Sequence, residues 1–327
     1  MKKKIAIIGS GIGGLTAANL LIKNSDFEII VYEKEKMLSL DEGYGIQLAT
    51  NSISILNKIG FRNIGTNDIF NPLKLNFYSN NNKICDLDLG RFNKDSVKYT
   101  TLQRSTLIEF LKEQLFSNNF RFGKEVKKVS KIKDKLLINF ADNTNDLVDF
   151  IIVSDGAFSN TKSIIENKII KLRYNGSVAI RALIRLSEEF SYESKNISLI
   201  MLPNAHVVIY PINKKNDFNL VCIVREKLSK NYDIRSIIQK KILSKNKDLE
   251  NLFKSELNLW PVYVSKKPIQ SIHENVFYLG DAFHTFVPAL AQGASQSIEA
   301  AYELFSLLSE NKKNIQNLYF KKRLKKT

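Results

Sequence analysis

Ile5-Ala6-Ile7-Ile8-Gly9-Ser10-Gly11-Ile12-Gly13-Gly14 is the stretch that decides the fold of this chain. An apolar run, predicted as a buried strand over residues 4–8, passes into glycines and then into a predicted helix over residues 13–23. In such a turn Gly9 permits the tight bend, Gly11 lets the backbone approach a pyrophosphate, and Gly14 lets helix and strand pack closely. The helix N-terminus adds amide donors and a positive dipole end. The stretch therefore predicts a nucleotide-binding βαβ unit.

A carboxylate stands where such a unit would bind a ribose. A second strand is predicted from Glu28 to Tyr32, and Glu33 follows it. At this distance from the glycines a carboxylate can accept hydrogen bonds from the ribose diol, which favours an unphosphorylated ribose. NAD and FAD proteins share this fingerprint, so it does not decide which dinucleotide binds.

Composition is that of a folded enzyme. The chain has 327 residues, of which 44% are hydrophobic and 25% charged. No stretch approaches 18 uninterrupted apolar residues, so a membrane-spanning helix is not expected and the protein is interpreted as cytoplasmic. Cys85 and Cys222 lack metal-ligand spacing, so neither a disulfide framework nor a metal site is predicted.

The net charge of +16 raises the question of a polyanionic partner. Lysines are spread along the chain, so we favour compositional bias over nucleic-acid binding. A denser cluster closes the chain, formed by Lys321, Lys322, Arg323, Lys325 and Lys326. It has two interpretations, a frayed solvated terminus, which we favour, and an amphipathic helix in weak contact with an acidic membrane.

The order of predicted elements indicates two interleaved domains. Strands at 125–132, 135–140 and 148–153 follow helices that start at a predicted N-cap, Asn51, and near Ser105. A block from 174 to 264 consists mostly of strands. The predicted class is α/β, a glycine-rich Rossmann-like βαβ domain interleaved with a mostly β substrate domain. The first comprises residues 1–72, 96–173 and 265–327, and the second 73–95 and 174–264.

A later motif favours FAD. Tyr278-Leu-Gly280-Asp281 places an acid at the end of a strand predicted from Val276 to Leu279, where it can bind ribityl hydroxyls. Gly293 and Ala294 then open a helix predicted from Gln292 to Leu308. Backbone amides at that helix start can stabilise negative charge on a reduced flavin.

With these motifs the sequence resembles the group A flavoprotein monooxygenases, the family of p-hydroxybenzoate hydroxylase and salicylate hydroxylase. The resemblance also rests on four further segments, which are Gly43-Tyr-Gly45-Ile46-Gln47-Leu48, Thr101-Leu-Gln-Arg104, Ser154-Asp155-Gly156-Ala-Phe-Ser159 and Leu290-Ala-Gln292-Gly293-Ala294. The sequence of the segment from Leu290 to Ala294 is most similar to that of the salicylate hydroxylase branch. The resemblance implies that Arg104 contacts FAD, that the Val126 backbone meets the adenine, and that Asp155 serves both FAD and the reductant. The expected FAD contacts are Gly9, Gly11, Gly14, Glu33, Lys34, Arg104, Val126, Asp155, Asp281, Gly293 and Ala294.

Some positions depart from the family pattern. Lys162 stands where Arg is usual, Phe283 replaces a small residue, Ser295 replaces Asn, and Ala300 stands where Asp is frequent. The first two leave open how the reductant binds.

The resemblance also implies the reaction. NADH or NADPH reduces FAD, O2 forms a flavin C4a-hydroperoxide, and this hydroxylates a small aromatic substrate. The protein must position the substrate and exclude water. Oligomeric state is not predicted.

His206, Tyr210 and Gln47 are the candidate catalytic residues. Strand alternation puts His206, Val208 and Tyr210 on one face, and the salicylate hydroxylase branch has a similar His and Tyr-Pro strand beside its substrate. His206 would orient or deprotonate a hydroxyl, and Tyr210 would hydrogen-bond a ring substituent. Gln47 lies in the loop expected near the isoalloxazine. Ordinary packing remains the alternative for all three.

Two further candidates are more ambiguous. Arg181 and Arg185 share a face of the strand predicted from Val178 to Leu186 and are either a fork for a substrate carboxylate or solvated sheet residues. His284 is expected to be structural, helping to hold its loop.

Other functions stay open. A polyprenyl-phenol hydroxylase of quinone synthesis and a non-hydroxylating FAD oxidoreductase are the enzyme alternatives. A flavin halogenase is disfavoured because Trp260 is the only tryptophan, so the Trp-x-Trp-x-Ile-Pro signature is absent. A non-catalytic flavin-binding or nucleic-acid-binding protein is the alternative of a different class.

Overall fold

The computed structural model describes residues 2–38, 40, 44–185, 192–288, 291–310 and 312–326. Gly43, Leu186 and Leu290, which belong to the predicted motifs and strands, lie outside the described residues.

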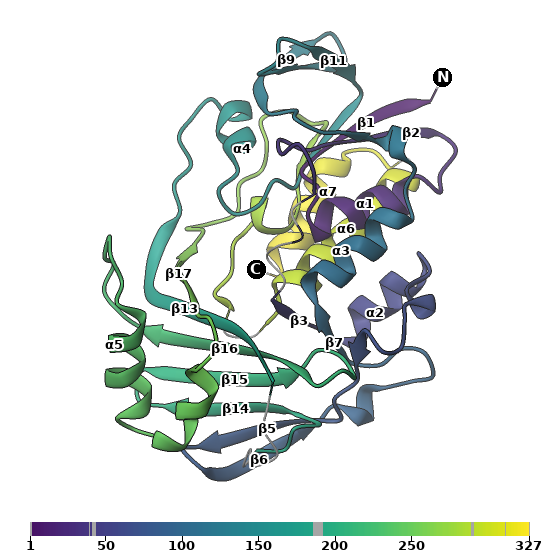
Figure 1. Ribbon diagram of the computed structural model, residues 1–327. Coiled ribbons are helices and arrows are strands. Elements are labelled where there is room, and N and C mark those ends of the chain that lie inside the picture. The colour runs from purple at the N-terminus through teal and green to yellow at the C-terminus, as the bar shows by residue number, and fades with distance from the viewer. Residues whose placement is uncertain are drawn as a thin grey trace.

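A five-stranded parallel sheet carries the N-terminal motif (Figure 1). The chain begins with strand β1 (Lys3–Ile8), helix α1 (Ile12–Leu21) and strand β2 (Phe27–Tyr32), which confirms the predicted βαβ unit. The sheet order is β18-β12-β1-β2-β8, and every neighbouring pair is parallel. The other strands are β8 (Phe120–Arg121), β12 (Phe150–Val153) and β18 (Val276–Tyr278).

Both faces of this sheet are covered, which explains the unbroken apolar sequence of β1. Ile5 and Ile7 point into a core that they share with helices α1, α3 and α6. Ala6 and Ile8 point the other way, toward a small antiparallel sheet of order β11-β10-β9. That sheet consists of β9 (Val126–Ile132), β10 (Lys135–Phe140) and β11 (Asn145–Val148).

Helices form a layer on the first of these faces (Figure 1). Helix α1 contacts α3 and α6, and α6 also contacts α2 and α7. Helix α2 begins at Thr50 after the cap residue Ala49, so the predicted N-cap Asn51 is wrong. The Asn51 side chain instead donates a hydrogen bond to Glu299 of α6, which fastens the two helices together. The bounds are α2 (Thr50–Asn57), α3 (Arg104–Glu113), α4 (Asn160–Ile165), α6 (Gly293–Ser309) and α7 (Ile315–Leu324).

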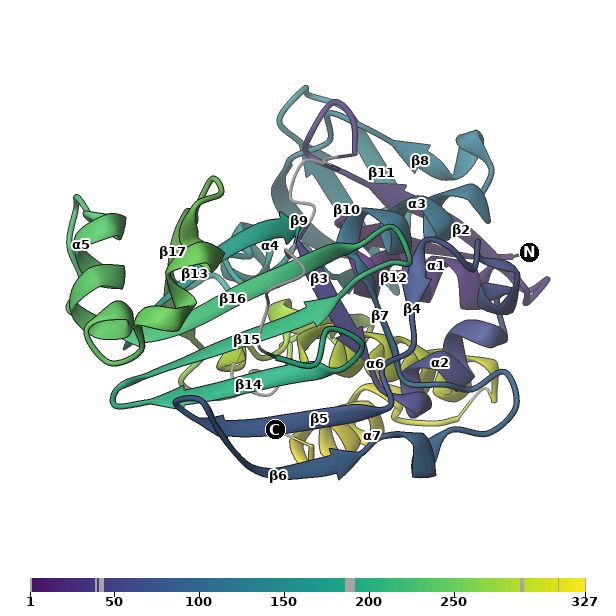
Figure 2. The same cartoon turned by 60° about the horizontal axis from the view of Figure 1, so that its bottom comes forward.

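A seven-stranded sheet of order β17-β13-β16-β15-β14-β5-β6 forms the second layer (Figure 2). Helix α5 (Ile234–Ile238), a π turn and a 3-10 helix (Lys247–Phe253) cover one face, and their apolar side chains form one core with that face. The opposite face is turned toward the first layer. The strands are β5 (Lys74–Ser79), β6 (Asn82–Asp88), β13 (Arg173–Arg185), β14 (Ile197–Leu202), β15 (Ala205–Pro211), β16 (Asp217–Arg225) and β17 (Asn258–Val264).

The strands of this sheet come from the parts of the chain in which a mostly β block was predicted. The α/β class with an interleaved β part is therefore confirmed. The domain boundaries themselves stay a prediction.

A third, short antiparallel sheet joins the two layers. Its order is β3-β7-β4, with β3 (Gly45–Leu48), β4 (Ile69–Phe70) and β7 (Thr100–Gln103). Strand β3 also contacts β16, and the Gly45 amide donates to Asn219 Oδ1 at 2.7 Å. This sheet places the Gly45 segment beside the face of the seven-stranded sheet that faces the first layer.

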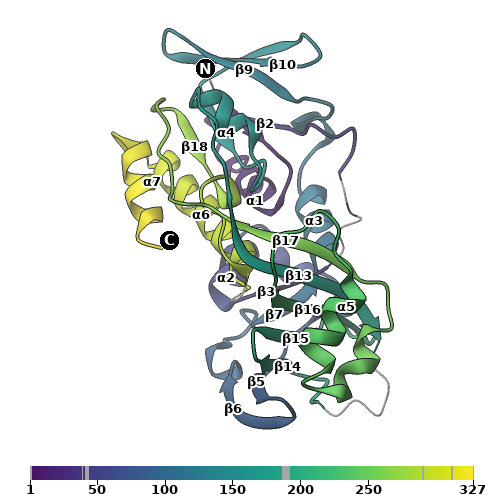
Figure 3. The ribbon, with the colours of Figure 1, turned by 90° about the vertical axis from the view of Figure 1, so that its left-hand side faces the viewer.

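The basic C-terminal segment forms helix α7, so the predicted fraying is wrong, whereas the predicted solvation holds for its four lysines, which are exposed. Helix α7 packs beside α6 and away from the seven-stranded sheet (Figure 3). Tyr319 and Arg323 are each 2% exposed, and Arg323 forms an ion pair with Glu303 at 3.3 Å. Membrane contact through this segment stays a prediction. Across the described ranges, no helix combines the length and apolarity needed to cross a bilayer.

Candidate active site

One cavity opens at the glycine turn, where the parallel strands end. Most of the predicted nucleotide contacts line it, namely Gly9, Gly11, Glu33, Lys34, Arg104, Val126 and Asp155. They come from five separate segments of the sequence. Gly9, Glu33 and Asp155 follow the carboxyl ends of the parallel strands β1, β2 and β12, whereas Arg104 and Val126 reach the cavity from the ends of the two small antiparallel sheets.

The glycines of this turn have distinct constraints. A Cβ on Gly14 would lie 2.2 Å from Gly9 O and 2.5 Å from Ser154 Oγ, so no side chain fits between helix and strand. Gly9 has φ +99°, and its Cβ would lie 2.7 Å from Ser154 O. Gly11 is different, because a Cβ there would meet nothing within 4 Å. The open side of the turn is therefore at Gly11, where the backbone can approach a ligand.

Glu33 is held against the turn. Its Oε2 accepts hydrogen bonds from the Ser10 amide at 3.0 Å and from Ser10 Oγ at 2.5 Å. Its Oε1 accepts a hydrogen bond from the amide of Glu35 at 3.1 Å. The carboxylate is thus fixed at the end of β2 with its acceptor atoms beside the cavity.

Asp155 faces the same cavity from the end of β12. Its Oδ1 is buried without a hydrogen-bond partner among the described residues, and burial raises the pKa of this carboxyl. A buried acceptor without a partner is costly unless a ligand supplies a donor.

Two departures from the family pattern lie in the interior rather than on a cavity wall. Lys162 is 4% exposed, and its Nζ donates to the Ala282 carbonyl at 2.7 Å, while burial lowers its pKa. Phe283 packs its ring against Tyr319 and Phe320 of α7. Neither residue lines the glycine-turn cavity or the cavity over the seven-stranded sheet. Lys162 acts through its hydrogen bond and its charge near Asp281, and Phe283 acts through packing.

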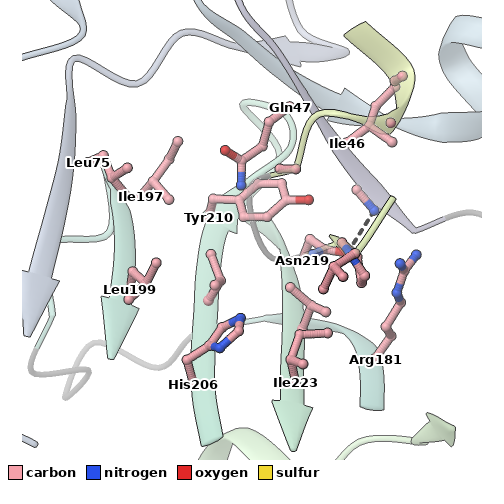
Figure 4. Close-up of a pocket in the computed structure, with 18 of the residues that line it drawn as sticks. Ile46, Gln47, Leu75, Arg181, Ile197, Leu199, His206, Tyr210, Asn219 and Ile223 are labelled. Atoms are coloured by element: carbon pink, nitrogen blue, oxygen red, sulfur yellow. Dashed lines mark hydrogen bonds between the residues drawn. The ribbon is translucent and has the colours of Figure 1, made fainter. Parts of the chain in front are cut away.

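A second cavity, of about 370 Å³, lies on the face of the seven-stranded sheet that faces the helices (Figure 4). This volume falls within the range of small-molecule sites. One row of its floor crosses five strands in register and consists of Phe77, Leu199, Val208, Val221 and Arg181. Neighbouring rows add Leu75 and Ile197 on one side and Ile223 on another. The floor is therefore largely apolar, which suits a ring.

All three candidate catalytic residues line this second cavity. His206 and Tyr210 share a face of β15, with Val208 between them, as predicted, and Gln47 projects from β3 above them (Figure 4). Burial lowers the pKa of His206, so the imidazole is neutral at neutral pH and can accept a proton. Tyr210 is 3% exposed, and burial raises its pKa. The geometry brings these residues together, and their catalytic roles stay a prediction.

Sequence reasoning missed two polar residues of this cavity. Tyr99 donates its hydroxyl hydrogen to Gln47 Oε1 at 2.8 Å, and burial raises the pKa of Tyr99 to about 12. Asn219 accepts from the Gly45 amide and also lines the cavity. Asn219 is a buried polar residue among the apolar residues of β16, within the block predicted as mostly β, and this contrast was a usable signal. Nothing in the sequence links Tyr99 to Gln47.

The opposite wall is formed by the start of α6 and the loop before it. Asp281, Gly293 and Ala294 line it. Asp281 is accessible from the cavity but enclosed by protein elsewhere, and this enclosure raises the pKa of its carboxyl while the nearby Lys162 opposes the rise. A Cβ on Gly293 would meet nothing within 4 Å, so the backbone at the start of this 17-residue helix is open to a ligand.

The two arginines of β13 lie in different environments. Arg181 lines the cavity, whereas Arg185 is exposed and pairs with Asp217 at 3.0 Å. His284 is outside the cavity lining, and its ring contacts Phe286 at 4.7 Å between centroids. Its Nδ1 has no hydrogen-bond partner within the described part of the chain. A hydrogen bond from that atom therefore does not hold the loop.

Comparison with known proteins gives a family. The family model described as FAD binding domain matches residues 2–314. The chain is 26% identical to 3-amino-4-hydroxybenzoate 2-monooxygenase PtnB3 of Streptomyces platensis, over 94% of this chain and 80% of that one. It is 22% identical to a salicylate hydroxylase of Pseudomonas putida, over 96% of this chain and 78% of that one. Among solved structures, HpxO of Klebsiella pneumoniae with FAD and uric acid has a TM-score of 0.88 at 19% identity, covering 99% of this chain and 84% of that one.

Proposed function

The chain belongs to the FAD binding domain family and, within it, to the group A aromatic monooxygenases, and from this premise we propose that it hydroxylates a small aromatic substrate with NADH or NADPH and O2. FAD is its cofactor.

The residues present fit this cofactor. The turn is open at Gly11, where a pyrophosphate would lie, and Glu33 offers fixed acceptors for the adenosine ribose. The unpartnered Oδ1 of Asp155 offers an acceptor beside the same cavity. At the other cavity Asp281 would hold ribityl hydroxyls, and the open backbone at Gly293 would face the flavin ring.

The observation that carries the proposal is the arrangement of the second cavity. A largely apolar floor, set with a neutral histidine and a buried tyrosine, faces the wall formed by Asp281 and the start of α6. A flavin on that wall would have an aromatic ring held opposite it. This is the geometry that ring hydroxylation requires, because the reacting atoms must be positioned and water excluded.

The side chains have separable tasks in this proposal. The bound flavin supplies hydride acceptance from the reduced nicotinamide and the activation of O2. His206 accepts the proton of a substrate hydroxyl, which makes the ring a better nucleophile. Tyr210 and Gln47 hydrogen-bond the ring substituent, and the aliphatic floor excludes water from the reacting carbon.

The test is a substrate panel on the purified yellow holoenzyme. Phenols and hydroxylated aromatic acids are compared for their stimulation of NADH and NADPH oxidation, with peroxide measured and products identified by mass spectrometry. We expect at least one compound to be hydroxylated in proportion to the nicotinamide consumed. Oxidation that yields only hydrogen peroxide with every compound would support a non-hydroxylating oxidoreductase instead.

A further inference from the structure

Arg181 is the permanent cation of the substrate cavity. The other ionisable residues lining it are His206, which is neutral, and Asp281, Tyr99 and Tyr210. Arg181 projects from β13 beside Val221, at one end of the row that crosses the floor. A guanidinium stays charged at any physiological pH. A fixed positive charge therefore lies at one end of a floor row whose other members, Phe77, Leu199, Val208 and Val221, are apolar.

Within the described ranges, no carboxylate is paired with this charge. The Arg181 Nε is shielded from solvent and has no hydrogen-bond partner among these residues. Arg185, four residues along the same strand, does have such a partner in Asp217. Lys162 is the charge that acts on Asp281, which is the one acid among the described residues of the cavity lining. Donors left unused in a shielded position are costly unless a ligand satisfies them.

Two aromatic rings hold the guanidinium in place. Its carbon lies 5.7 Å from the Tyr44 ring centroid and 6.0 Å from that of Trp260. The two rings meet edge to face with centroids 5.1 Å apart. Such contacts orient a guanidinium through its π face and leave the N–H donors at its edge free for a planar acceptor.

The lining of the cavity changes from apolar to polar across the sheet, from β5 and β14 toward β13. Figure 4 shows Leu75, Ile197 and Leu199 on one side, His206 and Tyr210 in the middle, and Arg181 with Asn219 on the other. A ring over β15 would therefore have hydrocarbon edges toward β14 and β5, and a substituent toward β13. The substituent that matches a guanidinium fork is a carboxylate.

We propose that Arg181 binds the carboxylate of the substrate, so that this enzyme selects hydroxylated aromatic acids over neutral phenols. This inference rests on the proposed function for the ring's position, because it places the aromatic ring over His206 and Tyr210.

The test compares each acid with its own amide. Salicylate, 3-hydroxybenzoate and 4-hydroxybenzoate are titrated into the FAD-loaded protein beside the three matching hydroxybenzamides, and binding is followed by the flavin absorbance change. We expect the wild type to bind at least one acid more tightly than its amide. Arg181→Met keeps a long apolar side chain against the two rings. It should lower the binding affinity for that acid roughly 10- to 100-fold, the range for a lost charged hydrogen bond. Amide binding should stay unchanged.

Two further variants sharpen the comparison. Arg181→Lys should recover part of the affinity, because the charge returns without the planar fork. Arg185→Met is the matched control on the same strand, outside the cavity, and should bind acids as the wild type does.

Other outcomes separate the alternatives. If Arg181 contacts the flavin instead, Arg181→Met will lower the affinity for FAD, or it will lower the affinities for acids and amides equally. Either result would mean that the proposal is wrong. Equal binding of acids and amides by the wild type, or no binding of either, would also overturn it. If acids bind through Arg181 and no hydroxylated product forms, the carboxylate site stands and the proposed reaction fails.

Discussion

At the residue scale, the decisive feature is that His206 is neutral in a half-buried position. Burial lowers its pKa from 6.5, and no acid is among the causes that act on it. A neutral imidazole accepts a proton without first losing one, so His206 on the cavity floor is the residue that we propose as the base.

Replacing His206 should impair hydroxylation of the substrate and leave reduction of the flavin by NADH or NADPH intact. His206→Asn should keep FAD and its reduction by NADH or NADPH, yet lower coupled hydroxylation roughly 10²- to 10⁴-fold, as expected for a lost general base. Stopped-flow spectra of each half-reaction will show which step fails. Tyr210→Phe is the milder companion and should weaken substrate binding only. Normal coupled rates in both variants would mean that this strand is core and the pocket lies elsewhere.

The same group predicts a pH dependence. Because the pKa of His206 is lowered, its neutral form persists as pH falls and is lost only below 6.5. The acid limb of hydroxylation should therefore lie below pH 6.5 in the wild type and be absent in His206→Asn. An acid limb above pH 6.5 would assign the titration to another group.

Asp281 gives a prediction about cofactor retention. Asp281→Asn keeps the size of the side chain and removes its charge, so FAD affinity should fall roughly 10- to 100-fold. The side chain is open to the cavity, so the melting temperature of the FAD-free protein should not fall. Fluorescence titration with FAD measures the first effect and thermal unfolding the second. Unchanged affinity would mean that other groups hold the ribityl chain.

Individual site residues were predictable to the extent that local sequence determined them. Glu33 and Asp281 follow apolar strands, and His206 and Tyr210 alternate on one strand, so pattern alone put them on the right faces. Tyr99 was not predictable, because its partner Gln47 is 52 residues away and only the pairing of β3 with β7 brings them together.

At the element scale, the glycine turn of the βαβ unit separates folding from binding. Gly11 and Gly14 are three residues apart, and a methyl group added at each meets opposite conditions, open space at the first and backbone at the second. A matched pair of alanine variants therefore tests the two roles independently.

Gly14→Ala should destabilise the protein by roughly 1 to 3 kcal/mol, the usual cost of overpacking, because its Cβ would lie 2.2 Å from Gly9 O. Gly11→Ala should unfold as the wild type does, since Gly11 already has an extended backbone with φ −75°. It should nevertheless bind FAD more weakly, because the methyl group occupies the open side of the turn. Urea unfolding of the FAD-free variants and FAD titration give the two results. Equal stability losses, or full FAD affinity in Gly11→Ala, would refute the division of roles.

Helices and strands with a strong hydrophobic periodicity were predictable from the sequence, and short strands were not. The βαβ unit matches its predicted ranges within a few residues, and β13 (Arg173–Arg185) includes every described residue of the strand predicted from Val178 to Leu186, because burial on one or both faces imposes the pattern. The sheet formed by β3, β7 and β4 escaped prediction because its strands have only two to four residues. Helix α7 was misjudged because its charges obscured the buried Tyr319 and Arg323.

At the scale of the whole molecule, long-range contacts join the two layers. The bond from Gly45 to Asn219 spans 174 positions of sequence, and the substrate cavity lies between the segments that it joins. No local pattern specifies such a contact, so the interleaved order of segments was predictable and the shape of the cavity was not.

The strong positive charge is not all on the surface. Arg323 is 2% exposed, pairs with Glu303, and donates to Gln296 Oε1 at 2.6 Å. Arg323→Met should therefore destabilise the protein by roughly 1 to 3 kcal/mol, because it removes the charged hydrogen bonds to Glu303 and Gln296 while Lys326 still pairs with Glu303 at 2.7 Å. Lys322→Met, on the exposed side of the same helix, is the control and should change stability little. Urea unfolding compares them, and equal stabilities would mean that α7 does not depend on this ion pair.

The central claim is that oxygen from O2 enters an aromatic substrate at the cavity above β15. The most direct measurement is turnover of the best substrate under ¹⁸O2, with mass spectrometry of the product. We expect a product that carries one labelled oxygen atom, formed in proportion to the NADH or NADPH consumed, and no label when only the water is ¹⁸O-enriched. An unlabelled product, or nicotinamide oxidation with all labelled oxygen recovered as hydrogen peroxide, would contradict it.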